Sequence, residues 1–135
     1  QQGDILFSHI NSLEHIGKVA FWESDIELYH GMNLLLLRTN SMAHNRYVYY
    51  WLGSNYGRSK TATLAKQAVN QASINTSELK QIKIPLPTLP EQAAIVAILF
   101  DLDSEIDALE AQRAKVQAIK QGMLQELLTG RTRLV

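Results

Sequence analysis

Residues 56–75 carry many hydroxyl, amide and basic side chains and no carboxylate. Lysine and arginine neutralise DNA phosphates, while arginine, glutamine, asparagine, serine and threonine hydrogen-bond to base edges in the major groove. The same composition also fits a solvated, slightly basic loop, and the residues alone favour neither interpretation. The candidate DNA-contacting residues in and around this segment are Arg38, His44, Arg46, Arg58, Lys60, Lys66, Gln67, Asn70 and Gln71.

Charge is segregated along the chain, although the net charge of the 135 residues is zero. Residues 31–83 hold seven basic residues against the single acid Glu78, a net charge of +6. Residues 91–110 hold six acids and no base, and residues 111–135 hold five bases against Glu126. Blocks of one sign indicate partners, so we expect the first block to face a polyanion and the later blocks to influence how the C-terminal part pairs.

The residue patterns needed for catalysis are missing. The sequence has no glycine-rich phosphate-binding loop, no Asn/Asp-Pro-Pro-aromatic motif of an amino-methyltransferase and no spaced carboxylate–lysine set of a nuclease. The four histidines, His9, His15, His30 and His44, lack the spacing of metal ligands. The absence of cysteine excludes disulfides, cysteine–zinc sites and thiol nucleophiles. We therefore expect a non-catalytic chain without a metal site.

One long helix is predicted for residues 91–128, after Pro90 and before Gly130. Thr88 and Glu91 have the spacing of a capping box, and at 1.5 Å per residue the helix would be about 57 Å long. Apolar residues recur at alternating steps of four and three, which is a heptad seam with two basic interruptions. The seam consists of Ile95, Leu99, Leu102, Ile106, Leu109, Arg113, Val116, Lys120, Met123 and Leu127. A lone helix cannot bury such a seam, so we expect a partner along it.

The residues before this helix are expected to form a small α+β domain. The pattern predicts strands over residues 3–8, 18–22, 33–38 and 82–86, helical segments over 40–52 and 56–64, and one helical turn over 77–80. Residues 9–17 and 67–74 are interpreted as loops. Four consecutive leucines at 34–37 predict a strand buried on both faces. This longest apolar run is too short to cross a bilayer and no secretory signal is present, so we expect a cytoplasmic protein.

An aromatic cluster at residues 47–51 has two possible roles. Aromatic rings can stack on bases, but at helical spacing with Leu52 they are typical of a helix face that is buried against strands. We expect the buried face. His44 and Arg46 would then point outward from the first turns of the same helix, where they could contact a groove or phosphates.

Three segments resemble the specificity subunit of type I restriction–modification systems: residues 3–8 (GDILFS), residues 82–92 (IKIPLPTLPEQ) and residues 127–134 (LLTGRTRL). Members of that family carry two target recognition domains and two long antiparallel helices, which separate two DNA half-sites and dock methyltransferase subunits. The resemblance implies that residues 1–87 are part of a target recognition domain and residues 88–135 one long helix with a basic tail. The chain would be either a fragment or a half-sized subunit that dimerises.

The resemblance implies a non-catalytic subunit that recognises double-stranded DNA, and it favours DNA contact for the basic segment. Methyltransferase subunits would dock on the helix and bring the restriction subunit, and S-adenosylmethionine and ATP with magnesium would belong to those partners. The charge blocks independently predict antiparallel helix pairing, in a homodimer or with a sister helix, because parallel copies would place acid beside acid. The alternative is a coiled-coil assembly adaptor whose globular head binds protein. The salt dependence of binding distinguishes these two functions, since DNA binding weakens steeply as the salt concentration rises.

Overall fold

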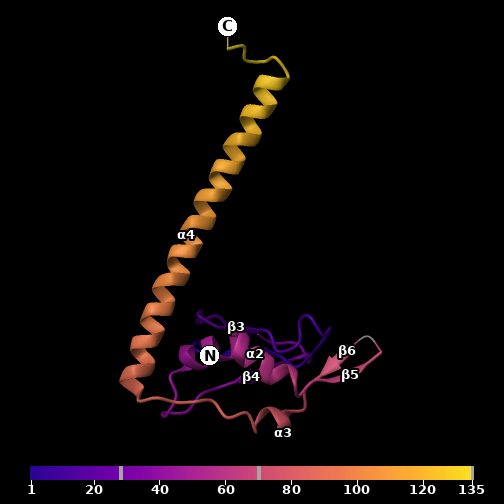
Figure 1. Cartoon of the computed structure of the whole chain (residues 1–135), viewed down its shortest axis with the longest axis vertical. Helices are drawn as coiled ribbons and strands as arrows, with labels where there is room; N and C mark the ends of the chain where they lie inside the picture. Colours follow the sequence, from indigo (N-terminus) through magenta and orange to yellow (C-terminus); the bar gives the residue numbers. More distant parts are fainter. Residues whose placement is uncertain (28, 70, 135) are drawn as a thin grey trace. The chain divides into compact units, whose positions relative to one another are not determined.

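The computed structural model describes residues 1–27, 29–69 and 71–134. The chain folds into two compact units, Gln1–Val96 and Ala97–Val135, and one long helix contributes residues to both (Figure 1). The described part of the first unit holds two small antiparallel sheets and short helices, so the predicted α+β class with one long helix is confirmed. Among the described residues, no helix combines the length and the apolar character needed to span a bilayer.

The first sheet is antiparallel with strand order β3-β1-β4. Its strands are β1 (Ile5–Ser8), β3 (Val19–Phe21) and β4 (Leu34–Leu37), which confirms three predicted strands. Alternation along β1 places Ile5 and Phe7 in the core, both 0% exposed, and leaves Leu6 on the opposite face beside Leu36. Leu36 is 41% exposed, so the prediction that β4 is buried on both faces is wrong.

Two helices follow the first sheet, and α1 (Asn45–Gly53) packs against the face that carries Ile5. Tyr47, Val48 and Leu52 are buried in that core, and the neighbouring aromatic residues pack around it. The interpretation of this aromatic cluster as a buried helix face is therefore confirmed. Helix α2 (Asn55–Ala62) begins after Ser54, whose Oγ accepts a hydrogen bond from the Gly57 N–H at 3.1 Å.

The start of α1 differs from the prediction. The helical segment was expected to begin at residue 40, but the Asn40 side chain accepts a hydrogen bond from the Met42 N–H at 3.0 Å and its carbonyl accepts one from the Ala43 N–H. These bonds close a turn ahead of the helix, and His44 occupies the N-cap position. Asn40 therefore belongs to a turn rather than to the helix, a position that asparagine favours.

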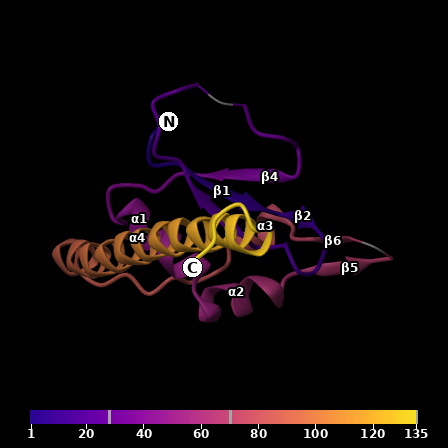
Figure 2. The same cartoon turned by 90° about the horizontal axis from the view of Figure 1, so that it is seen from above.

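A second sheet forms where loops were predicted. It has strand order β2-β6-β5 and consists of β2 (Ile10–Asn11), β5 (Lys66–Ala68) and β6 (Gln71–Ser73). Figure 2 shows the hairpin of β5 and β6 extending outward from β2. Ala72 and Ile74 join Phe7 and Ile16 in a second core, which ties this sheet to the first. The loop predictions for these strands are wrong because two or three polar residues carry no detectable alternation.

The segment that approaches the long helix is not a strand, contrary to the prediction for residues 82–86. The preceding turn is α3 (Thr76–Leu79), close to the expected position. Instead of joining a sheet, the segment is held by contacts of its own. Tyr47 Oη donates to the Pro85 carbonyl at 2.9 Å, and Ile84 packs against the first core.

Helix α4 spans Leu89–Leu128, which is 40 residues or about 60 Å. The Thr88 carbonyl accepts the N–H of Gln92, so the helix starts at the predicted threonine. Gly130 adopts a φ of +74°, a left-handed conformation that glycine tolerates and that ends the helix at its predicted stop. Gln92 and Val96 are buried in the first unit, so the first two turns of α4 belong to its core.

Candidate nucleic-acid interface

Arg38 is held in an ion pair with a buried carboxylate rather than presented to solvent alone. Its Nε and Nη2 donate to the two carboxylate oxygens of Asp4, each at 2.7 Å, and Asp4 is only 3% exposed. The hydrogen bonds from Arg38 lower the pKa of Asp4 well below its usual range, and the carboxylate raises the pKa of Arg38. The pair joins the start of β1 to the end of β4, so the structure gives Arg38 a structural role.

Arg46 and His44 are half-buried, although both were expected to point outward. Arg46 Nη2 lies 2.5 Å from Glu23 Oε1, and the guanidinium carbon lies 4.6 Å from the centroid of the Phe21 ring. The backbone N–H of His44 donates to Gln92 Oε1 at 2.8 Å, and the His44 Nδ1 atom is buried without a hydrogen-bond partner among the described residues. Both residues therefore take part in packing within the first unit.

Arg58 and Lys60 lie on the exposed side of α2. Lys60 Nζ is 5.3 Å from the centroid of the Tyr56 ring, and Arg58 Nη2 reaches the Glu14 carbonyl at 3.5 Å. Both contacts are loose and leave the charged groups in water. These two cations are the best placed of the predicted set for phosphate contact.

The loop of residues 12–17 lies directly against α2. Gly17 has a φ of +76°, and a Cβ there would lie 2.8 Å from Thr61 Oγ1, so a larger residue would not fit. Lys18 follows this loop and donates from Nζ to His15 Nδ1 at 2.7 Å. Lys18 and His15 are both exposed, but they line a hollow with Leu6 on the face of the first sheet opposite its core and do not join the α2 cations.

The same loop also borders the β5–β6 hairpin. A small hollow of about 140 Å³ is lined by Leu13, Gln67, Ala68, Val69 and Gln71. Both glutamines are exposed, and Asn70, the remaining predicted residue of the hairpin, lies outside the described residues. Loop 12–17 thus brings α2 and the hairpin together. We call this surface the basic surface and define it by Arg58, Lys60, Lys66, Gln67 and Gln71.

Lys66 is partly neutralised at the base of the hairpin. Its Nζ lies 2.8 Å from Glu78 Oε1, which is the one acid of the basic block. The Lys66 side chain is still 70% exposed. An exposed pair of this kind is weak and can open in the presence of another anion.

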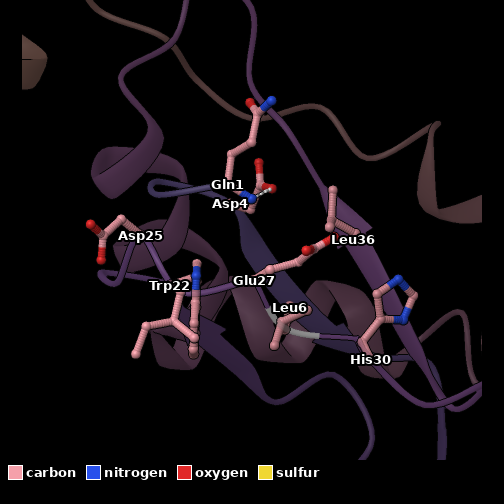
Figure 3. A pocket seen from close by; sticks show the side chains of 9 residues that line it. Gln1, Asp4, Leu6, Trp22, Asp25, Glu27, His30 and Leu36 are labelled. Carbon is pink, nitrogen blue, oxygen red and sulfur yellow. Dashed lines mark hydrogen bonds and ion pairs between the residues drawn. The ribbon is translucent and has the colours of Figure 1, made fainter.

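A separate cavity of about 350 Å³ lies beside the exposed face of β1 and β4 (Figure 3). Its lining includes the carboxylates of Asp4, Asp25 and Glu27 together with Trp22 and His30. Its acidic character does not suit a polyanion. Within the part of the chain that the structure describes, no three histidine or carboxylate side chains are grouped so that they could hold a metal ion.

The heptad seam of α4 is largely open to solvent. Five apolar residues of the seam are each 51–57% exposed: Leu102, Ile106, Leu109, Val116 and Met123. Arg113 and Lys120 are exposed too, and Leu99 and Leu127 are half-buried. Ile95 departs from the predicted role, because it packs against the first core and is already covered within the first unit.

Apolar residues outside the predicted seam are also exposed on α4, and sequence reasoning missed them. They include Ile98, Phe100, Ile119 and Leu124, which are 40–63% exposed. On a helix of about 3.6 residues per turn, Ile98, Ile119 and Leu124 fall beside the seam and broaden the apolar stripe, whereas Phe100 falls on another face. The helix therefore offers a wider contact surface than the seam alone.

Comparison with known proteins identifies relatives for most of the chain. The family model of the type I restriction modification DNA specificity domain matches residues 1–118. A Methanocaldococcus jannaschii protein described as a specificity subunit of the type I restriction enzyme MjaX is 49% identical over 129 residues. The MjaVIII specificity subunit of the same organism is 32% identical over 89 residues. The matches cover 94% and 66% of this chain but only 30% and 21% of those relatives.

Proposed function

Because the chain belongs to the family of type I restriction modification DNA specificity domains, we propose that it recognises a specific sequence in double-stranded DNA for a type I restriction–modification complex. The observation that carries the proposal is the basic surface, where α2, loop 12–17 and the β5–β6 hairpin gather cations and amide side chains. Residues 56–75 contribute no carboxylate to it, and Glu78 is already paired with Lys66.

The cations divide into two groups according to their partners. Arg38 and Arg46 are paired with Asp4 and Glu23 and stabilise the first unit. Arg58 and Lys60 have no comparably close acidic partner among the described residues, and so they can neutralise phosphates. DNA affinity is therefore assigned to α2 and its surroundings rather than to the whole basic block.

We assign the long helix to docking. Methyltransferase subunits, and the restriction subunit through them, would cover the exposed apolar stripe of α4, with a second helix of this type lying antiparallel beside it. The exposure of the seam supports this role. S-adenosylmethionine and ATP with magnesium would be held by the partner subunits, because this chain has neither a phosphate-binding glycine loop nor a methyltransferase motif. The chain itself would contribute recognition and positioning only.

The test is a salt titration of duplex binding by the full chain, followed by fluorescence anisotropy. The double variant Arg58→Ala/Lys60→Ala should bind more weakly, and the slope of log affinity against log salt should fall by roughly one unit per lost phosphate contact.

The control is Lys115→Ala/Arg133→Ala, which removes the same charge from the second unit. It should keep the parent's slope. If the two double variants behave alike, or if the chain binds no duplex, the assignment of DNA binding to the basic surface is wrong.

A further inference from the structure

The β5–β6 hairpin is a two-stranded ribbon at its outer end, beyond β2, because Ala72 and Ser73 of β6 also pair with β2 and Gln71 does not. Directly opposed residues of antiparallel strands point to the same face, and the register pairs Lys66 with Ser73 and Ala68 with Gln71. All four of these side chains are exposed. The intervening residue of β6, Ala72, is 1% exposed and points into the second core, so the orientation of the ribbon is determined by packing.

The end of the ribbon carries an apolar side chain that packs on very little. Val69 is 97% exposed, although β-branched apolar residues normally contribute to stability by burial. Val69 borders the small hollow beside Leu13, yet its side chain remains almost wholly in solvent. An apolar group presented next to amide side chains has the chemistry that recognises the C5 methyl group of thymine.

From this arrangement we infer that the ribbon enters the major groove and reads A·T base pairs, with Gln71 on adenine and Val69 on the thymine methyl group. The major groove admits a two-stranded ribbon, and a glutamine amide matches the N6 and N7 edge of adenine. The inference rests on the proposed function, which assigns duplex DNA to the basic surface, and it adds the element and the base chemistry that give specificity.

The charges of the ribbon support a reading role rather than an affinity role. Lys66 is the one cation among the described residues of β5 and β6, and it lies at their base beside Glu78. The exposed cations Arg58 and Lys60 belong to α2. Phosphate binding and base reading are thus carried by different elements, which can be altered separately.

The experiment begins with the full chain and a randomised duplex pool, from which its preferred site is selected. Gln71→Ala should weaken binding to that site by roughly 5- to 150-fold, which is the range for one bidentate base contact. Binding to unrelated duplex, and the salt slope, should not change. The matched control Gln81→Ala removes an exposed glutamine outside the ribbon and should leave the preference intact.

Two substitutions test the base assignment directly. Gln71→Arg should shift the preferred base from adenine to guanine, because arginine matches the O6 and N7 edge of guanine. Replacing the contacted thymine by deoxyuridine should weaken binding of the parent and have no further effect on Val69→Ala. Equal melting temperatures of the variants and the parent show that the fold is retained.

The outcomes distinguish failure of the ribbon as the base reader from failure of the proposed function. A parent chain that binds duplex selectively, with a preference unchanged by Gln71→Ala and Gln71→Arg, refutes the ribbon as the reader and leaves the proposed function standing. A parent chain without selective duplex binding refutes the proposed function and the ribbon together.

Discussion

Asp4 and Arg38 show how single side chains in the basic block are committed to the fold. Both carboxylate oxygens of Asp4 accept hydrogen bonds from Arg38, 34 positions away in sequence. Arg38 is itself exposed, but its loss would remove two hydrogen bonds from the buried Asp4 carboxylate, and a buried charged group without its partners is destabilising. Replacement of Arg38 should therefore lower the free energy of unfolding.

We predict that the Asp4–Arg38 pair makes stability sensitive to acid. The hydrogen bonds from Arg38 lower the folded-state pKa of Asp4 below its unfolded value of 3.8, so below that pH the unfolded chain binds more protons than the folded chain. The stabilisation is fully present above about pH 5 and is lost progressively as the pH falls through and below 4. Urea unfolding from pH 6 to pH 3 should show this loss in the parent.

The control for this prediction is Asp4→Asn, which cannot titrate. Its free energy of unfolding should be lower than the parent's at pH 6, and the difference should shrink toward pH 3. A constant difference across this range would show that the pair does not couple stability to pH.

At the scale of elements, the junction between α1 and α4 depends on Gln92. This side chain is 0% exposed, and its amide satisfies three backbone groups. Its Oε1 accepts from the His44 N–H, and its Nε2 donates to the carbonyls of Met42 and Pro87 at 3.3 and 2.8 Å. The first turn of α4 is thereby fastened to the start of α1 and to the proline-rich segment.

We predict that Gln92→Leu lowers the free energy of unfolding of the first unit by about 2–4 kcal/mol, because three backbone groups lose the partner that a fully buried side chain provides. Denaturant unfolding followed by tryptophan fluorescence measures it, since Trp22 and Trp51 lie in this unit. Gln112→Leu is the control, because Gln112 is exposed on α4. A loss as large for Gln112→Leu as for Gln92→Leu would contradict the anchoring role.

At the scale of the whole molecule, the charge blocks of α4 bear on assembly. Residues 91–110 contain six acids and no base, and residues 111–135 contain five bases and one acid. Exposed ion pairs contribute only a few tenths of a kcal/mol each, so burial of the apolar stripe must drive association. The charges select orientation, because an antiparallel arrangement removes the like-charge contacts of a parallel one.

We predict that two copies of the chain associate with their α4 helices antiparallel and crossing near residue 111. Position 102 of one copy then lies beside position 120 of the other. Because the chain contains no cysteine, Leu102→Cys and Lys120→Cys introduce single thiols. Oxidising a mixture of the two variants should give mainly mixed disulfide dimers, whereas efficient linkage of Leu102→Cys to itself would show parallel pairing.

The sequence by itself determined the family, the α+β class, the long helix and three of the strands. These features depend on local signals, because helix periodicity, a glycine stop and short apolar runs act within a few residues of each other. The stop at Gly130 and the core residues Ile5 and Phe7 illustrate this. The candidate seam was predicted in the same way, apart from Ile95 and the additional exposed apolar residues.

Only the tertiary structure decided which polar residues are available for recognition. The sequence shows no difference in availability between the basic side chains of the chain. In the folded structure Arg38, Arg46 and Lys66 are paired, because acids distant in the chain come to lie beside them, whereas Arg58 and Lys60 are not paired in this way among the described residues. The second sheet was hidden for the same reason, since β6 becomes a strand by pairing with β2, some sixty positions earlier. Side-chain partners and strand partners are long-range contacts, and a local pattern holds no information about them.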